Sequence, residues 1–278
     1  MRRSPFHFAS RIARLLAGLA VVSCLAAPAR AETEVDLALV LAVDISYSMD
    51  PEEQQLQRDG FIAAFRSAEV HAAIRRGLVG KIGVAYVEWA GGWDQKVVLP
   101  FTVIDGPEAA AAFAASLSQK PTRRAARTSI SGAIDFSAKL LADSDLKANR
   151  QVIDISGDGP NNQGRPVTAA RDDAVERGIT VNGLPLMLKE GEVFDIADLA
   201  GYYRSCVIGG AGAFLVPVRG REQFVDAVKT KIVMEIAERP VPGPARQFGG
   251  APVIPAQQEG APANCLIGEM QWRERMGN

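Results

Sequence analysis

This sequence contains few histidines and few cysteines, and its net charge is close to zero. Of 278 residues, two are histidine and three are cysteine, and aromatic residues make up 6%. Sites built on histidine, such as zinc centres and histidine-based acid–base pairs, are therefore disfavoured. The formal net charge of −1 provides no broad basic surface for nucleic acid. Three cysteines are also too few for a small scaffold held together by disulfides.

Long hydrophobic runs are also missing, although the composition is otherwise that of a globular protein. Apolar residues make up 47% and charged residues 23% of the chain, which is close to average and excludes disordered and collagen-like chains. The apolar stretch at residues 15–27 has 13 residues and is too short to cross a bilayer core of ~30 Å. The length allows one large domain or two small ones.

Residues 1–31 have the pattern of a secretory signal peptide. Four arginines without any acid precede the apolar stretch, and an Ala-x-Ala ending follows it at residues 29–31. We therefore predict cleavage after Ala31 and export, with the periplasm of a Gram-negative bacterium as the expected destination. A membrane anchor is an alternative that the short apolar stretch disfavours. A second alternative is lipid attachment at Cys24, because residues 21–24 loosely fit a lipoprotein processing site.

Removal of this leader changes both the charge and the cysteine count. Its five arginines reduce the 31 basic residues to 26, against 32 acidic residues, so the net charge becomes −6. This predicts a soluble acidic protein, without a transmembrane segment, that does not coat anionic membranes. Two cysteines remain, Cys206 and Cys265. In an exported protein they predict a disulfide, with two separate buried thiols as the alternative.

Short apolar runs alternate with amphipathic stretches from residue 35 onward. The predicted strands are residues 35–43, 81–89, 96–102, 151–156, 179–186 and 213–218. The predicted helices are residues 51–68, 107–118, 129–142, 166–177, 195–203 and 221–236. Near-continuous apolar strands separated by helices are typical of a parallel sheet covered on both faces. We therefore predict an α/β fold, with a doubly wound, mostly parallel sheet of six strands and helices on both faces.

The regular pattern of apolar residues ends near residue 239, and this change suggests where the domain boundaries lie. Residues 32–238 form the predicted α/β domain. Residues 239–263 contain six prolines and little periodic character, and we predict an extended linker there. Residues 264–278 form a short polar tail that carries Cys265 and Trp272.

Polar side chains are placed where predicted strands end or helices begin. Asp44, Ser46 and Ser48 follow the first strand, Thr128 precedes a helix, and Asp158 follows the strand at 151–156. Ligands of a doubly wound sheet bind at the carboxyl ends of its strands. Two carboxylates and three hydroxyls are hard oxygen ligands that suit Mg²⁺. Each residue alone is typical of a turn or a helix cap, but together they favour a metal site.

The order Asp44-x-Ser46-x-Ser48, then Thr128, then Asp158-Gly159 resembles the metal-ion-dependent adhesion site, or MIDAS, of von Willebrand factor type A (VWA) domains. The resemblance implies a Rossmann-like VWA fold. It also implies that the hydroxyls of the two serines and the threonine contact Mg²⁺ or Mn²⁺ directly. The two aspartates then act directly or through water, and a carboxylate of a partner protein completes the coordination.

The resemblance covers about residues 35–238. Further stretches, at residues 86–90, 154–162 and around Cys206, resemble an exported bacterial branch of the family that has no assigned function. One position departs from the family pattern, because Arg127 stands where the family usually has glycine. Arg127 lies in a basic loop, for which we consider pairing with the site aspartates, attraction of an anionic partner, or simple solvation.

Two acids are unusual for a buried sheet. Glu88 ends a predicted strand at the edge of the metal site, so it is a candidate second-shell residue or additional ligand. Asp154 lies inside a strand and is likewise a second-shell candidate; alternatively, it pairs with an arginine below the site, because an unpartnered buried carboxylate is costly. Trp89 and Trp93 flank a glycine pair and form either a contact surface or part of the core.

The favoured function is an exported module that binds a divalent cation and, through it, a protein partner, with no role for nucleic acid. The alternative is a Mg²⁺-dependent periplasmic hydrolase or phosphatase on a similar sheet. Enzymatic activity is not expected: no nucleophile–base pair is visible, Ser46 replaces the second aspartate of an Asp-x-Asp phosphatase motif, and no phosphate-binding glycine loop follows the first strand. A structural envelope protein with a vestigial site is a third hypothesis.

Overall fold

A computed structural model describes residues 32–188, 196–237, 246–248, 251–256 and 262–277. The predicted leader, with Cys24, lies outside the described residues, as does the first residue of the helix expected at 195–203. Residues 32–278 form one compact unit, and the fold described below belongs to that unit.

The described strands form one sheet in the order β3-β2-β1-β4-β5-β6-β8-β7. Its central strand β1 pairs in parallel with β2 and β4, β4 with β5, and β5 with β6. The edge strand β3, which contains Pro100, runs antiparallel to β2. The bounds are β1 Thr33–Asp44, β2 Ile82–Trp89, β3 Gln95–Ile104, β4 Leu146–Gly157, β5 Ile179–Pro185, β6 Phe214–Leu215, β7 Arg246–Phe248 and β8 Ala251–Pro255. The predicted doubly wound, mostly parallel sheet is confirmed.

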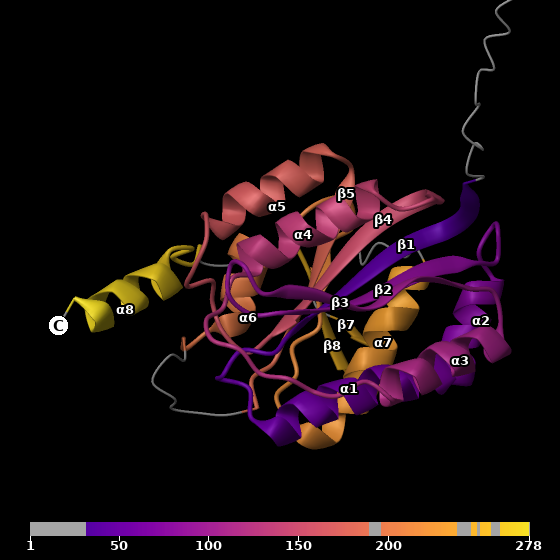
Figure 1. The fold of residues 1–278 in the computed structure, drawn as a ribbon, viewed down its shortest axis with the longest axis horizontal. Helices are drawn as coiled ribbons and strands as arrows, with labels where there is room; N and C mark the ends of the chain where they lie inside the picture. The colour runs from indigo at the N-terminus through magenta and orange to yellow at the C-terminus, as the bar shows by residue number, and fades with distance from the viewer. Residues whose placement is uncertain (1–31, 189–195, 238–245, 249–250, 257–261, 278) are drawn as a thin grey trace, which may run out of the picture. The chain divides into compact units, whose positions relative to one another are not determined.

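Helices cover both faces of this sheet (Figure 1). One face carries α1 (Pro51–Arg66), α2 (Ala68–Arg75), α3 (Pro107–Ser118) and α7 (Phe224–Ile236), which follows a short 3-10 turn at Arg221–Gln223. The other carries α4 (Ile130–Ala142), α5 (Val167–Glu176) and α6 (Leu199–Tyr202), which continues into a π-helical turn at Tyr203–Val207. Helix α8 (Ile267–Met276) follows the sheet in sequence.

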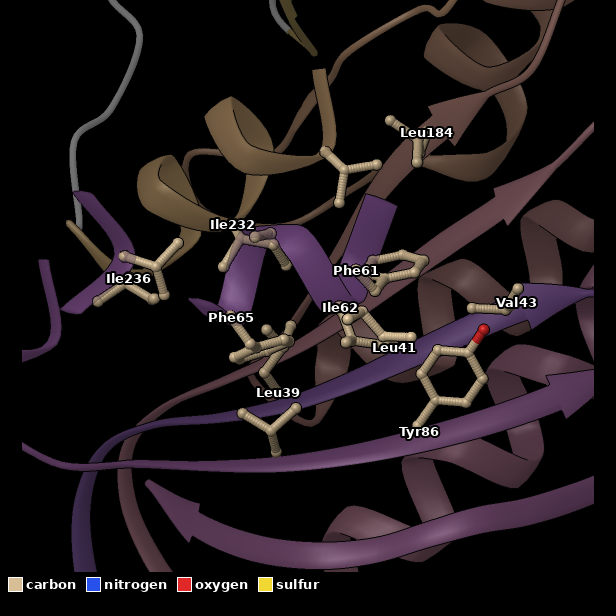
Figure 2. Close-up of a cluster of buried hydrophobic side chains, with 14 of the residues drawn as sticks. Leu39, Leu41, Val43, Phe61, Ile62, Phe65, Tyr86, Leu184, Ile232 and Ile236 are labelled. Atoms are coloured by element: carbon tan, nitrogen blue, oxygen red, sulfur yellow. The ribbon is translucent and has the colours of Figure 1, made fainter. Parts of the chain in front are cut away.

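The core is divided between the two faces by the alternation of β1 side chains. Leu39, Leu41 and Val43 point toward α1 and α7 (Figure 2). Ala38, Val40 and Ala42 lie on the opposite face, in the cluster that packs against α4 and α5. All are buried, and each large side chain removed from water stabilises the fold by roughly 2 kcal/mol. A strand with apolar residues on both faces is therefore fixed at the centre of the sheet.

The start of α1 follows the sequence closely, but its end does not. Asp50 accepts a hydrogen bond from the Glu53 backbone N–H and Glu53 accepts one from that of Asp50, at 2.8 and 2.9 Å, which is the predicted capping box. The single helix expected over residues 51–68 is broken at Ser67, whose backbone is extended. The Ser67 hydroxyl accepts a hydrogen bond from the Val70 N–H and caps α2, so a second helix begins there.

The segment expected as a linker contains structure. Strands β7 and β8 lie within residues 239–263 and extend the sheet beyond the six strands expected. Strand β8 pairs Ile254 and Pro255 with Leu215 and Phe214 of β6, and Val253 is buried. The pairing satisfies backbone groups that β6 would otherwise leave open at an edge. The polar tail at 264–278 is also folded, since it contains α8.

Candidate metal site

The first loop of the candidate site starts at Asp44, the fully buried last residue of β1. Its Oδ1 accepts a hydrogen bond of 2.7 Å from the Ser46 N–H, which closes a tight turn. The hydroxyls of Ser46 and Ser48 lie 2.9 Å apart and share a hydrogen bond. The turn therefore gathers one carboxylate and two hydroxyls at the carboxyl end of the central strand.

Asp158 joins this turn from the neighbouring strand. Strands β1 and β4 are paired, with Val43 opposite Ser156, so their ends lie side by side. The Ser48 hydroxyl donates a hydrogen bond of 2.7 Å to Asp158 Oδ1. Gly157 permits the close approach, because a Cβ at that position would lie 2.9 Å from Asp44 Oδ2. The two predicted carboxylates thus belong to one hydrogen-bonded cluster.

Thr128 is tied to the Asp158 loop through its backbone. Its N–H donates to the Asn162 side-chain oxygen at 2.9 Å, and its carbonyl accepts from the Asn162 N–H at 2.8 Å. The preceding loop also pairs with the first one, since Ala125 forms a β-bridge with Ser46. The five predicted residues therefore lie on three loops that are connected by hydrogen bonds. Asn162, which makes two of these bonds, was not singled out from the sequence.

The charge at the site fits a cation. Asp44 Oδ2 is buried and has no hydrogen-bond partner among the described residues. Burial, and next the negative charge of Asp158, raise the pKa of Asp44 well above its ordinary value. A divalent cation would offset both effects. The described residues contain no cluster of three or more His, Cys, Asp or Glu side chains that could hold a metal. The available donors are two carboxylates and three hydroxyls, which suit Mg²⁺ or Mn²⁺.

Tyr203 is a neighbour of Asp44 that sequence analysis missed. It opens the π-helical turn, and its hydroxyl is buried without a hydrogen-bond partner in the described part of the chain. A Cβ on Gly157 would lie 3.0 Å from this hydroxyl and 2.9 Å from Asp44 Oδ2. The hydroxyl therefore lies near the carboxylate without a hydrogen bond to it among the described residues, and no local sequence signal reveals this because the two residues are far apart in the chain.

Glu88 lies close to the site, and Asp154 has a different partner from the arginine expected. Glu88 is buried in ion pairs with Arg58 and Arg123. Burial raises its pKa, and the two arginines oppose that shift. Its carboxylate faces a small pocket that Asp44 also lines, but two guanidinium groups already neutralise it. Asp154 pairs with Lys231 of α7 at 2.8 Å, so the expectation of an arginine partner was wrong. The lysine reaches it from the helix that covers this face of the sheet.

Exposed aromatic and basic side chains lie on the loops after β1 and β2 and before α4, which adjoin one another. Tyr47, between the two site serines, is 61% exposed, and Trp93 on the loop after β2 is 98% exposed. Trp89, by contrast, is fully buried in the core. The Arg124 guanidinium lies 5.4 Å from the centre of the Tyr47 ring and donates to the Tyr47 carbonyl. The exposed side chains of Tyr47, Trp93 and Arg124 are called the rim of the site below.

The backbone of Arg127 shows how arginine is accommodated where the VWA pattern has glycine. Its φ is 76°, in the left-handed region that glycine adopts without strain. The backbone therefore retains the conformation expected of a glycine, although the residue is an arginine. Its guanidinium stacks 3.3 Å from the ring centre of Trp272 in α8. The Arg127 side chain therefore contacts α8, whereas the sequence had suggested pairing with the site aspartates.

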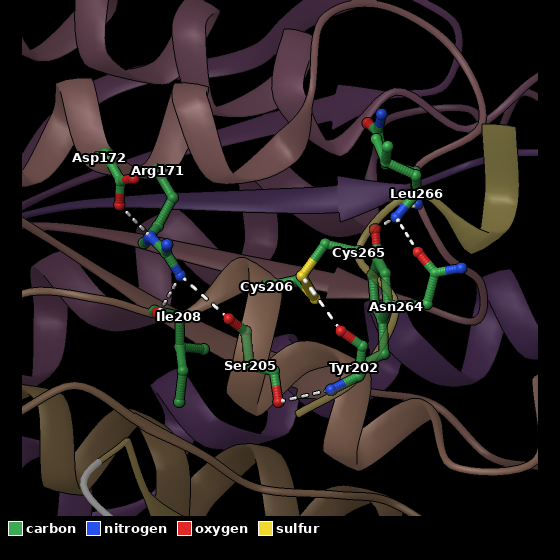
Figure 3. The surroundings of a disulfide bond; sticks show 11 residues. Arg171, Asp172, Tyr202, Ser205, Cys206, Ile208, Asn264, Cys265 and Leu266 are labelled. Carbon is green, nitrogen blue, oxygen red and sulfur yellow. Dashed lines mark hydrogen bonds and ion pairs between the residues drawn. A yellow bond between two sulfur atoms is a disulfide. The ribbon is translucent and has the colours of Figure 1, made fainter. Parts of the chain in front are cut away.

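The predicted disulfide between Cys206 and Cys265 is confirmed. It joins the π-helical turn after α6 to the segment just before α8 (Figure 3). Next to it, the Ala263 N–H donates to the Ser205 hydroxyl. The bond therefore holds the C-terminal segment against the domain. In the part of the chain that the structure describes, no helix has the length and apolar character needed to span a membrane.

Comparison with solved structures identifies the fold. Proximal thread matrix protein 1 from the mussel byssus superposes with a TM-score of 0.51 at 14% identity, over 74% of this chain and 49% of that one. A further structure of that protein, at a TM-score of 0.50, has a zinc-occupied MIDAS motif. A von Willebrand factor type A protein from Catenulispora acidiphila gives 0.51 at 12% identity, over 73% and 43% of the chains. These identities establish the fold alone.

The pilus adhesin SpaC from Lactobacillus rhamnosus GG gives a TM-score of 0.54 at 10% identity, over 82% of this chain and 38% of that one. The chain thus spans about half the length, or less, of these structural neighbours. None of the curated proteins matches the sequence. Residues 34–240 match the family described as "Protein of unknown function (DUF1194)". The chain therefore belongs to the DUF1194 family, and its domain has the von Willebrand factor type A fold.

Proposed function

We propose that this protein is an exported module, resident in the periplasm, that binds Mg²⁺ or Mn²⁺ and through it a carboxylate of a partner protein. The ligands are Asp44, Ser46, Ser48, Thr128 and Asp158. The observation that carries the proposal is the buried Oδ2 of Asp44, which has no hydrogen-bond partner in the described part of the chain and lies next to a second carboxylate and to serine hydroxyls at one sheet edge. A structural neighbour with a zinc-occupied MIDAS motif supports it.

The composition of the ligand set suggests how a partner is recognised. Three of the five proposed ligands are neutral hydroxyls, and only the carboxylates of Asp44 and Asp158 carry charge that opposes that of the cation. When bound, the metal supplies a Lewis-acidic position that accepts an oxygen ligand. The buried turn at Asp44 fixes the direction of the hydroxyls, because its carboxylate is anchored by the Ser46 N–H. The role is binding and not catalysis.

The rim of the site favours an acidic partner segment with apolar side chains. Arg124 is exposed and makes no ion pair among the described residues. Tyr47 and Trp93 supply exposed aromatic area, and aromatic residues with arginine are common anchors of protein interfaces. The acidic character of the rest of the chain then leaves the rim as the attractive surface for a carboxylate-bearing protein.

Titration calorimetry with Mg²⁺ and Mn²⁺ tests the metal site. The purified protein is expected to bind at millimolar metal or below and to melt at a higher temperature when loaded, because a ligand of the folded state stabilises it. Asp44→Ala is expected to abolish both effects, and Ser48→Ala to weaken them. Asp105→Ala is the matched control, since Asp105 is exposed and follows β3, whose last residue pairs with the first residue of β2 at the opposite edge of the sheet from the site. Absence of binding by the unsubstituted protein, or equal binding by Asp44→Ala, contradicts the proposal.

A further inference from the structure

Helix α8 lies outside the region that defines the family, yet it contacts the loops of the candidate site. The family match ends at residue 240, whereas α8 spans Ile267–Met276. The Cys206–Cys265 bond fixes the start of this segment. In Figure 1, α8 (yellow) lies on the side of the sheet toward which β1 and β4 run.

The first contact is with the loop that begins at Asp158. Glu269 Oε1 accepts a hydrogen bond of 2.7 Å from the side-chain amide of Asn161. The helix backbone also lies against this loop, because a Cβ on Gly268 would be 2.1 Å from the Asn161 carbonyl oxygen. Asn161 is fully buried and accepts a bond from the Ser131 N–H at 3.0 Å. It therefore links α8 to the start of α4 as well as to the Asp158 loop.

The second contact is with the loop that presents Thr128. Trp272 supports the guanidinium of Arg127, the residue immediately before Thr128. Arg127 has a left-handed backbone, a conformation that non-glycine residues keep only when the surrounding structure holds them there. The stacking on Trp272 is such a restraint. Two side chains of one helix thus reach the two loops that Asn162 joins.

We propose that α8 is a positioning element of the metal site. Glu269 and Trp272 act through Asn161 and Arg127, and hold the loops that carry Asp158 and Thr128 in the geometry that a cation requires. The inference rests on the proposed function for its metal-binding readout. Because residues around metal ligands orient them, their loss weakens affinity while the ligands remain in place.

The disulfide makes this positioning dependent on redox state. A helix of ten residues is marginally stable when isolated. The covalent tether keeps α8 next to its contacts, and the sequence separation of 59 between the two cysteines makes its loss entropically significant. Reduction therefore frees α8 from the site loops more readily than it disturbs the sheet.

Substitutions on α8 test the proposal in the full chain. Glu269→Ala, Trp272→Ala and Gly268→Ala are each expected to lower Mg²⁺ affinity on the order of tenfold. Their melting temperature in a chelator should change little. Glu269→Gln and Trp272→Phe should restore affinity, because the acceptor oxygen and the aromatic face return. Glu274→Ala is the matched control on the same helix, since Glu274 is exposed. Equal affinity in the alanine variants and the control overturns the proposal.

Amide hydrogen exchange in a chelator provides a readout that needs no metal. Residues 125–131 and 158–163 should exchange faster in Trp272→Ala, in Cys265→Ser and after reduction, while the central strands keep their protection. If these loops exchange at the same rate in all forms, α8 does not position them and the inference fails. If the loops loosen but the unsubstituted protein binds no Mg²⁺, the proposed function fails and the positioning role stands as a property of the fold.

Discussion

Asp44 and Glu235 are buried carboxylates that belong to different clusters. Asp44 lies beside Asp158 at the edge of the sheet. Glu235, on α7, shares Lys231 with Asp154 and accepts a further hydrogen bond from the Asn182 side chain at 3.3 Å. Each cluster contains two carboxylates; in the second they share the Lys231 ammonium, whereas in the first the charge of Asp158 raises the pKa of Asp44. The first is therefore the place where an added cation relieves repulsion.

Asp44→Asn is expected to stabilise the metal-free protein while it removes metal binding. The amide cannot repel Asp158, and no buried charge remains unpartnered, so the free energy of unfolding in a chelator should rise on the order of 1 kcal/mol. Urea denaturation with chelator, and with saturating Mg²⁺, measures both effects. Asp105→Asn serves as the control. A loss of stability in the chelator would show that the carboxylate itself supports the loop.

Glu235 predicts a pH dependence of stability. Burial, and next the charge of Asp154, raise the pKa of Glu235 from 4.5 to about 7, and Lys231 opposes the shift. Between those two values the folded chain binds more protons than the unfolded chain. The contribution of Glu235 to the free energy of unfolding is therefore fully present at low pH and declines as pH rises through about 7.

Glu235→Gln is expected to remove this part of the pH dependence. The variant should exceed the unsubstituted protein by roughly 1–2 kcal/mol at pH 8 and by less at pH 5. Urea denaturation at the two pH values in a chelator measures the difference. Glu222→Gln, on an exposed position, should leave the pH dependence unchanged. A constant difference between Glu235→Gln and the unsubstituted protein at both pH values would contradict the assignment.

At the scale of elements, the boundaries are set by local hydrogen bonds where these exist. The start of α1 follows from Asp50, Pro51 and Glu53, which lie within four consecutive residues, so it was predictable. The division into α1 and α2 depends on one serine hydroxyl that serves both helices: Ser67 donates to the Ala64 carbonyl and accepts from the Val70 N–H. An apolar stripe continues across this point and does not reveal the break.

Ser67→Ala is expected to destabilise the protein by about 1 kcal/mol, because α2 loses its N-terminal cap. Ser118→Ala is the comparison, since the Ser118 hydroxyl donates to the Ala115 carbonyl at the exposed end of α3, and its loss should change stability by less than about 0.5 kcal/mol. Midpoints of urea denaturation separate the two. Equal effects would mean that α1 and α2 do not depend on the cap.

At the scale of the whole molecule, the sheet continues into the C-terminal segment. Strand β8 adds to β6, the disulfide ties Cys265 to Cys206, and α8 contacts the loops of the site. The DUF1194 match over residues 34–240 therefore ends before the structure does. Strand β8 extends the sheet beyond β6, and α8 contacts the loops that carry Asp158 and Thr128.

Export predicts a specific N-terminus for the protein as it occurs in the cell. The basic start, short apolar stretch and Ala-x-Ala ending predict that Glu32 is the first residue after processing. N-terminal sequencing of protein recovered from a periplasmic extract measures this directly. A lipid-modified Cys24 at the N-terminus would contradict it, and Ala31→Arg, which spoils the small-residue site, should leave the precursor uncleaved.

The sequence by itself determined the parallel sheet, most helix positions and the set of polar residues at the strand ends. Each of these depends on short-range information: hydrophobic periodicity, caps, and the rule that parallel strands end at one edge. The predicted disulfide followed from the expected compartment and the number of cysteines.

Only the tertiary structure decided the surroundings of Glu88, Asp154 and Asp44. Glu88 pairs with Arg58, Asp154 pairs with Lys231, and Asp44 lies near Tyr203, and each neighbour is far away in the chain, so periodicity contains no information about them. The same holds for β8. Its prolines predict a linker, and only the fold shows that it pairs with the edge of β6. A local pattern determines which groups a segment offers, but the packing of distant segments determines which groups those side chains meet.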